Sequence, residues 1–418
     1  MSGQHGIQVD ADGPAGPAER RFGDGLAVGD PRRGADGLVG AAEAAVEQAL
    51  RGLDGAPPDL LCVFVAPGSG DDPDRAAAAG RRAMQLGGAR AAFGATAGGV
   101  IGAGRGQEHG PAVAVWAAAL PGARVRTFRL SGAGVETGGA DPAGFAGLIR
   151  PAADDRMAAL LVDPYSFPIA GFLDRCNSAL PGFPLVGGLA SGPGGPGQNR
   201  LFQDGEVLGS GAVGVLLGAE AGARTVVSQG CRPIGPPMAV TRSDGNLLLE
   251  LAGVPAYQRL VDIVSALPPA EQGLVARGLH IGVAIDEYAD VHGRGDFLIR
   301  GVLGADERTG AVAVGEVVEL GRTVRFQVRD PAGAREDLVE LLGGEQRPGR
   351  GALLFSCNGR GRAMFPRPEF PGADHDVQVV REALGAAGVA GLFAAGEIGP
   401  VGGRNHLHGF TASVLVFR

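Results

Sequence analysis

The C-terminal part of the sequence concentrates side chains that could hold a small polar ligand. They lie in FSCNGRGRAMF (355–365), AAGEIGPVGG (394–403) and NHLHGFTASVLVF (405–417). Arginine binds carboxylates through paired N–H groups, and a glutamate can meet an ammonium group. These segments therefore predict a site for an amino acid-like or other anionic metabolite. The predicted ligand-binding residues are Cys357, Arg360, Arg362, Glu397, Asn405, His408 and Thr411.

Other interpretations of these residues stay open at the sequence level. Glu397 could pair with an arginine to hold two strand ends together, and Cys357 could be an inert core residue. Alternatively, Cys357 as nucleophile, His408 as base and Glu397 as orienting group would suit an acyl-transfer enzyme. His406 and His408 share one face of a strand, where each could bind haem iron or serve a structural role. The secondary candidates are Ser191, Asn199, Arg232 and His406.

Two familiar catalytic motifs fail on their context. GSGAVG (209–214) has the dinucleotide-binding spacing, but the strand-like VLLG follows it instead of a helix. GLASG (188–192) places its serine one position too late for a nucleophile elbow. The sequence has no Lys, which excludes a pyridoxal phosphate Schiff base and a phosphate-binding P-loop Lys. We therefore expect no catalytic residues and no metal site.

The elements that must position these residues form a repeat. A buried strand, an amphipathic helix, a Gly-rich strand end and a further apolar strand recur in that order. The three copies span residues 60–120, 158–218 and 351–417. We predict a duplication in which all copies have the same strand order, with function in one of them. Strand ends in Gly allow close approach of a ligand or of another backbone segment.

The segment at about 231–350 differs from the repeats. It predicts a helix at 257–267 and strands at 280–286, 296–304 and 312–320, in a partly antiparallel sheet. The fold class is therefore α/β (α+β), with two related domains that each contain a mixed sheet flanked by helices. The predicted divisions are a flexible tail (1–22), an N-terminal domain (23–230) and a C-terminal domain (231–418).

Composition predicts a soluble cytoplasmic chain. Apolar residues make up 45% and charged residues 20% of 418 residues, and no apolar run approaches a membrane span. The net charge of −8, without a basic stripe, argues against nucleic-acid and anionic-membrane partners. The four Cys lack the spacing of a zinc site or a disulfide framework, so a reducing compartment fits best.

The chain resembles the FIST family, named for F-box and intracellular signal transduction. The three C-terminal segments, in their order, resemble a FIST C-terminal domain. FGATAGGVIG (93–102), FPLVGGLASG (183–192) and LFQDGEVLGSGAVGV (201–215) resemble a FIST N-terminal domain. The resemblance implies a sensor that binds a small ligand and signals to a partner protein, such as a kinase or a cyclic-nucleotide enzyme. Some relatives bind haem, so a haem-based gas sensor is an alternative. Relatives with an F-box make a pure protein-interaction adaptor a further alternative.

Overall fold

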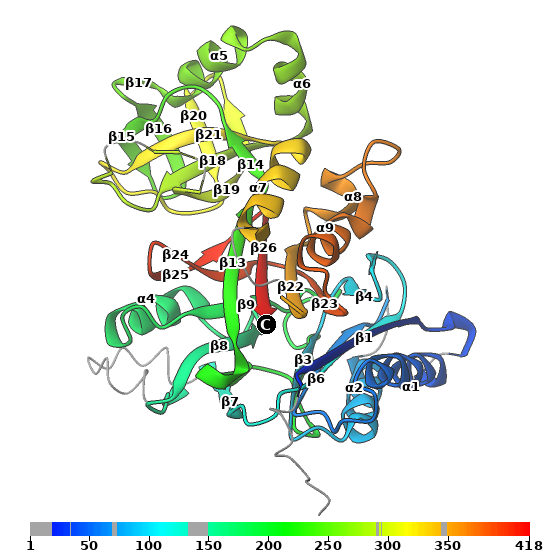
Figure 1. Cartoon of the computed structure of the whole chain (residues 1–418). Coiled ribbons are helices and arrows are strands. Elements are labelled where there is room, and N and C mark those ends of the chain that lie inside the picture. Colours follow the sequence, from blue (N-terminus) through cyan, green and yellow to red (C-terminus); the bar gives the residue numbers. More distant parts are fainter. Residues whose placement is uncertain are drawn as a thin grey trace, which may run out of the picture.

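The structure is a computed structural model that describes residues 19–33, 35–68, 73–132, 149–289, 292–293, 295–343 and 349–418. It contains three mixed six-stranded sheets flanked by helices and a separate antiparallel lobe, shown at the top of Figure 1. The predicted α/β fold class is confirmed.

Each of the three copies builds a sheet with the same strand order. The first sheet runs β1 (Arg21–Val28), β6 (Ala112–Ala119), β2 (Leu60–Ala66), β3 (Ala91–Thr96), β10 (Leu201–Gln203) and β11 (Glu206–Leu208). The second runs β7 (Val125–Leu130), β12 (Ala212–Gly218), β8 (Asp155–Val162), β9 (Leu185–Leu189), β24 (Glu397–Val401) and β25 (Arg404–His408). The third runs β13 (Ala223–Gln229), β26 (Thr411–Phe417), β22 (Gly351–Cys357), β23 (Gly388–Ala394), β4 (Val100–Gly102) and β5 (Arg105–Gln107). The predicted duplication is confirmed, because the strand order does not differ between copies.

The copies exchange hairpins in a cycle. The hairpin β10–β11 of the second copy completes the first sheet, and β24–β25 of the third copy completes the second. The hairpin β4–β5 of the first copy completes the third sheet. The three sheets are therefore one interlocked body, which we call the three-sheet core.

Helices cover the outer faces of the sheets, and the inner faces pack together. The helices α1 (Ala35–Arg51) and α2 (Pro73–Gly87) cover the first sheet, and α4 (Ile169–Ala179) covers the second. The third sheet is covered by α7 (Pro331–Gly343) and α9 (His375–Leu384). A single buried cluster between the sheets includes Trp116, Val186 and Phe355, one residue from each copy. All three sheets thus contribute to one central core.

One glycine recurs at the same place in each copy. A Cβ on Gly94, Gly187 or Gly391 would lie 2.0, 1.8 or 1.7 Å from a carbonyl oxygen of the neighbouring parallel strand. Only glycine permits that approach of two backbones. The Gly-rich strand ends predicted from the repeats are therefore an architectural feature common to all copies.

The lobe is a closed antiparallel barrel inserted between β13 and α7 of the third copy. Around the barrel run β21 (Thr323–Arg329), β15 (Met238–Asp244), β16 (Leu247–Leu251), β20 (Ala311–Val314), β19 (Phe297–Asp306) and β18 (Leu279–Ala284), and β18 pairs with β21 to close it. The short β14 (Cys231–Pro233) also pairs with β21, and β17 (Val254–Pro255) pairs with β16. The helices α5 (Ala256–Ala266) and α6 (Pro269–Arg277) pack on the barrel.

Two predicted ranges need correction, and one boundary has a structural counterpart. The predicted tail 1–22 overlaps β1, which begins at Arg21 because Phe22 packs against Trp116 and Phe417; residues 1–18 lie outside the described residues. The predicted strand 312–320 ends at Val314, where the chain turns and leaves Val317 exposed. The predicted domain boundary at 230/231 falls where the chain leaves the core and enters the barrel.

Candidate functional site

Three of the predicted residues meet in the third copy. Cys357 ends β22, Glu397 begins β24 and Thr411 begins β26, and all three side chains are buried. The Glu397 Oε2 atom accepts hydrogen bonds from the Thr411 backbone N–H at 3.1 Å and from Thr411 Oγ1 at 2.8 Å. The Cys357 thiol lies close enough for the Glu397 charge to raise its pKa. We call Cys357, Glu397 and Thr411 the polar trio.

The other copies show that the fold does not require these polar residues. Strand register places Glu397 opposite Gly188, Leu201 opposite Ala95 and Val100 opposite Leu392, always one residue beyond the repeated glycine. The same register places the first-copy residues Ala66, Val100 and Ala112 at the positions of the trio. The scaffold thus accepts apolar side chains where the third copy buries a thiol, a carboxyl and a hydroxyl group.

Burial determines the protonation of the trio. It raises the pKa of Glu397 to about 8, although the bonds from Thr411 oppose the rise. Within the described residues, Glu397 Oε1 has no hydrogen-bond partner. A Glu397 side chain with this pKa is mostly protonated at neutral pH. Burial, with the nearby Glu397 charge, also raises the pKa of the Cys357 thiol.

The alternative of a Cys357 nucleophile is not supported by this geometry. A thiol with a raised pKa stays protonated and weakly nucleophilic. His408, its predicted base, is buried and has its Nε2 atom 3.0 Å from the Gly399 carbonyl oxygen. Burial lowers the pKa of His408 to about 3, so it is a poor base at neutral pH. Cys357 and His408 therefore do not form the activated thiol–imidazole pair that acyl transfer needs.

The structure gives Arg360 a structural partner in place of the ligand predicted for it. Its guanidinium group is fully buried and already binds Asp376, with Nε and Nη2 at 2.7 and 2.8 Å from the two carboxylate oxygens. Ser356 and His375 also bind this carboxylate. Burial opposes ionisation of Asp376, but Arg360 outweighs it and holds the pKa of Asp376 well below its usual range. Arg360 therefore anchors α9 to the end of β22 through Asp376.

Two further predicted ligand residues have structural partners instead. The Asn405 side chain accepts a hydrogen bond from the Leu185 backbone N–H at 2.7 Å and exchanges bonds with Asn177 of α4, which fixes the exchanged hairpin on the second sheet. Arg362 is exposed and points to Glu108, 3.6 Å away. The structure therefore does not place Asn405 and Arg362 in the polar trio.

The secondary candidates also hold segments together. Ser191 donates to the Phe393 carbonyl oxygen and accepts from the Gly98 backbone N–H, which connects all three copies. Asn199 is buried and binds Thr96 and Asp163. Arg232 forms ion pairs with Glu271 at 3.1 Å and Asp330 at 3.2 Å, between the barrel and α7. These contacts join separate segments of the fold.

The histidine pair does not fit a haem site. His406 and His408 have ring centroids 5.9 Å apart, but His408 is buried and its Nε2 atom is engaged by Gly399. His406 Nε2 is buried without a partner in the described structure. No cluster of three or more His, Cys, Asp or Glu side chains suited to a metal occurs among the described residues.

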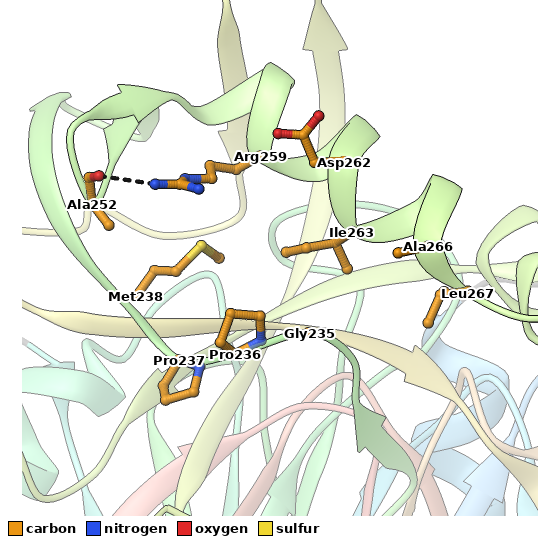
Figure 2. A pocket seen from close by; sticks show the side chains of 10 residues that line it. All are labelled: Gly235, Pro236, Pro237, Met238, Ala252, Arg259, Asp262, Ile263, Ala266 and Leu267. Carbon is orange, nitrogen blue, oxygen red and sulfur yellow. Dashed lines mark hydrogen bonds between the residues drawn. The ribbon is translucent and has the colours of Figure 1, made fainter.

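An apolar pocket lies in the barrel lobe, away from the predicted residues. Its volume is about 460 Å³, between α5 and the turn that joins β14 to β15 (Figure 2). The pocket is lined by Gly235, Pro236, Pro237, Met238, Ala252, Arg259, Asp262, Ile263, Ala266 and Leu267. Two charged side chains, Arg259 and Asp262, stand one helical turn apart on α5 beside this apolar surface.

Hydrogen bonds hold the charged groups of the pocket in place. Arg259 donates to the carbonyl oxygens of Leu251 and Ala252 at 3.2 and 3.0 Å, which fixes the start of α5 on the end of β16. Asp262 accepts from Gln258 at 2.7 Å. Neither charge is paired with an opposite charge among the described residues. The pocket thus has an apolar wall with the fixed Arg259 cation beside it, and the exposed Asp262 lies on the same helix.

Sequence reasoning missed this pocket, although it predicted the helix that forms one side of it. The proline-rich turn PIGPP (233–237) and the amphipathic helix at 257–267 were visible separately. Their juxtaposition depends on barrel strand pairs such as Met238 with Val324, which are far apart in sequence. The turn and the helix each leave a local pattern in the sequence, but the cavity between them leaves none.

Comparison with known proteins identifies the family. Residues 59–254 match the FIST N domain and residues 254–400 match the FIST C domain. An uncharacterized protein of Mycobacterium tuberculosis is 50% identical over 332 residues, which cover 78% of this chain and 83% of the relative. An uncharacterized protein of Mycobacterium bovis is 47% identical over 384 residues, which cover 90% and 96%. Within the described residues, no helix is long and apolar enough to cross a membrane. The chain therefore belongs to the FIST family, whose domains are associated with signal transduction and small-ligand sensing.

Proposed function

We propose that this protein is a sensor whose small ligand binds in the pocket between α5 and the 235–238 turn. The observation that carries the proposal is the combination of a mainly apolar cavity of about 460 Å³ with Arg259 and Asp262 beside it. Sites for small molecules usually combine such apolar walls with a few fixed polar groups.

The charges favour an amino acid-like ligand with an apolar side chain. A carboxylate would meet the guanidinium group of Arg259, and an ammonium group would meet the Asp262 carboxylate. The apolar side chain would rest on Met238, Ile263 and Leu267. This ligand class is the one predicted from the sequence, with Arg259 and Asp262 in the roles expected for Arg360 and Glu397.

The pocket is connected to the three-sheet core through a short path. The 235–237 turn continues directly from β14, whose Cys231 packs with Phe410 beside Phe297. Phe410 has a positive φ of 62° and immediately precedes Thr411 of the polar trio. A ligand that shifts the turn would act on this strained residue. We propose that the signal then passes to a partner protein, such as a kinase or a cyclic-nucleotide enzyme.

A thermal-shift screen with single amino acids tests this function. We expect apolar amino acids such as leucine and phenylalanine to raise Tm saturably, because a ligand bound to the folded state stabilises it. Ala266→Trp should fill the pocket and abolish the shift. Ser265→Trp is the matched control, since Ser265 is exposed on the same helix and does not line the pocket. Equal shifts in both variants would contradict the proposed site.

A further inference from the structure

The open edge of β13 is the strongest unassigned feature of the three-sheet core. β13 is the first strand of the third sheet, and among the described strands it pairs only with β26, along its whole length. Figure 1 shows it running from the barrel along the core, with α7 near its upper end. An edge strand presents a row of backbone donors and acceptors on its unpaired side.

Hydrogen bonds around β13 show which of its backbone groups face outward. The Gly222 carbonyl oxygen accepts from the Arg418 N–H, and the Gly230 N–H donates to the Phe410 carbonyl oxygen. The Gln229 N–H instead donates to the Asp337 side chain. Residues in an antiparallel pair alternate between facing the partner strand and facing away. Thr225 and Val227 therefore direct their N–H and C=O groups away from β26.

A groove follows this edge. Its volume is about 380 Å³, and β13 contributes its floor from Arg224 to Gln229. One wall is α7, with the half-exposed Leu341, and the other is the end of β24, with Pro400 and Val401. Room beside unpaired backbone groups suits an added strand, and the walls suit apolar side chains.

The end of the groove nearest the barrel is acidic. Asp296 is exposed there, and its Oδ2 atom accepts only the Gly293 N–H among the described residues. Asp337 lies on the same side of the groove and binds Ser228 and Gln229. A basic side chain on an incoming segment would complement this end.

We infer that the β13 groove binds an extended segment of a partner polypeptide, which adds a strand to the third sheet. The segment has apolar side chains against Leu341 and Val401 and a basic residue toward Asp296. Its main chain pairs with Thr225 and Val227. This surface gives the protein a docking place next to the junction of barrel and core.

Selection from a displayed library of random octapeptides against the full chain tests the inference. We expect enriched peptides with alternating apolar residues and a basic residue at one end. Thr225→Pro should weaken their binding at least tenfold, because proline removes an outward N–H and an edge strand tolerates it. Thr127→Pro is the matched control, because Thr127 occupies the equivalent position in β7. It should change binding less than twofold.

Two further measurements keep the test decisive. Leu341→Glu places a charge on the apolar wall without touching β13. It should also weaken binding at least tenfold, and it replaces Thr225→Pro as the test if that variant fails to fold. In a paired strand, every second peptide residue points its N–H toward β13. N-methylation of those residues should abolish binding, and N-methylation of the residues between them should leave it unchanged. Peptides that bind all variants equally, a library without enrichment, or self-association of the protein abolished by Thr225→Pro would overturn the inference.

Discussion

At the scale of single residues, Glu397 is the most informative side chain. It is a fully buried carboxyl group at a position where the equivalent strands carry Val100 and Leu201. The fold alone does not explain this carboxyl group, because the copies with apolar residues at this position have the same sheet register. Buried ionisable groups that a scaffold does not need often lie at functional sites, so Glu397 stays a predicted functional residue.

The Glu397→Leu variant tests how this carboxyl group affects stability. Its folded pKa of about 8 lies above the unfolded value, so Glu397 contributes stability fully below the unfolded pKa and loses it as pH rises to about 8. The loss has a limit of about 1.4 kcal/mol per pH unit. We expect the free energy of unfolding of the natural protein to fall relative to that of the variant as pH rises from pH 5 to pH 8. Urea denaturation at several pH values measures it, and a constant difference would contradict the raised pKa.

The Arg360–Asp376 pair gives a second prediction. Arg360→Ala leaves a buried carboxylate without its main partner, so we expect a loss of about 3–5 kcal/mol in the free energy of unfolding. Replacing both residues, Arg360→Met with Asp376→Leu, removes the charge and should recover most of that loss. Urea denaturation compares the two variants. If the double variant were as unstable as Arg360→Ala, the guanidinium group would have a role beyond this ion pair.

The residue types of the site were predictable, but their partners were not. The sequence indicates Cys357, Glu397 and Thr411 because each follows or begins an apolar strand near glycine, and these three do meet. It also suggested Arg360 as a ligand clamp. Asp376, which occupies Arg360, lies at the start of α9, where an acidic residue is expected for helix capping alone. Side-chain pairing between elements leaves no periodic signal.

At the scale of elements, the repeated glycine determines how the parallel strands pack. Gly187→Ala would place a Cβ 1.8 Å from the Leu160 carbonyl oxygen, so the strands β8 and β9 must separate. We expect this variant to lose cooperative unfolding or to be insoluble. Gly171→Ala on α4 is the matched control, because no atom lies within 4 Å of its added Cβ. It should be neutral or slightly stabilising. Circular dichroism melting curves compare them, and a native-like Gly187→Ala would contradict the close approach.

Most elements could be predicted because their signals are local. The helix expected at 257–267 is α5 within one residue at each end, and the copies share their predicted strand order. The strand expected at 312–320 was too long, since apolar residues after Gly315 are exposed rather than buried. Hydrophobic pattern predicts the existence of a strand better than its end.

At the scale of the whole molecule, hairpin exchange joins three repeats into one body and leaves the barrel as an insertion. No sequence pattern reveals that β24–β25 pairs with β9, more than 200 residues earlier, because the hairpin would fit its own sheet equally by composition. The sequence did indicate that the segment after residue 230 differs from the repeats. It could not show that this segment closes into a barrel with a pocket beside α5.

The proposed sensing site and the proposed docking site lie in different parts of the molecule. The proposed ligand pocket lies in the barrel, and the β13 groove lies where the barrel meets the core. The strand β14 leads from the pocket to Cys231, and β13 ends two residues before it. A signal that moved the barrel relative to the core would therefore reach the groove first.

Hydrogen-exchange mass spectrometry of the full chain, with and without a saturating apolar amino acid found by the thermal-shift screen, tests the central claim most directly. If the ligand binds as proposed, amides of residues 234–238 and 256–267 become protected, because the ligand lies between these two segments. The Ala266→Trp variant should show no ligand-dependent change. Protection centred on residues 357, 397 and 411 instead, or protection that persists in Ala266→Trp, would contradict the assignment of the ligand site to the barrel.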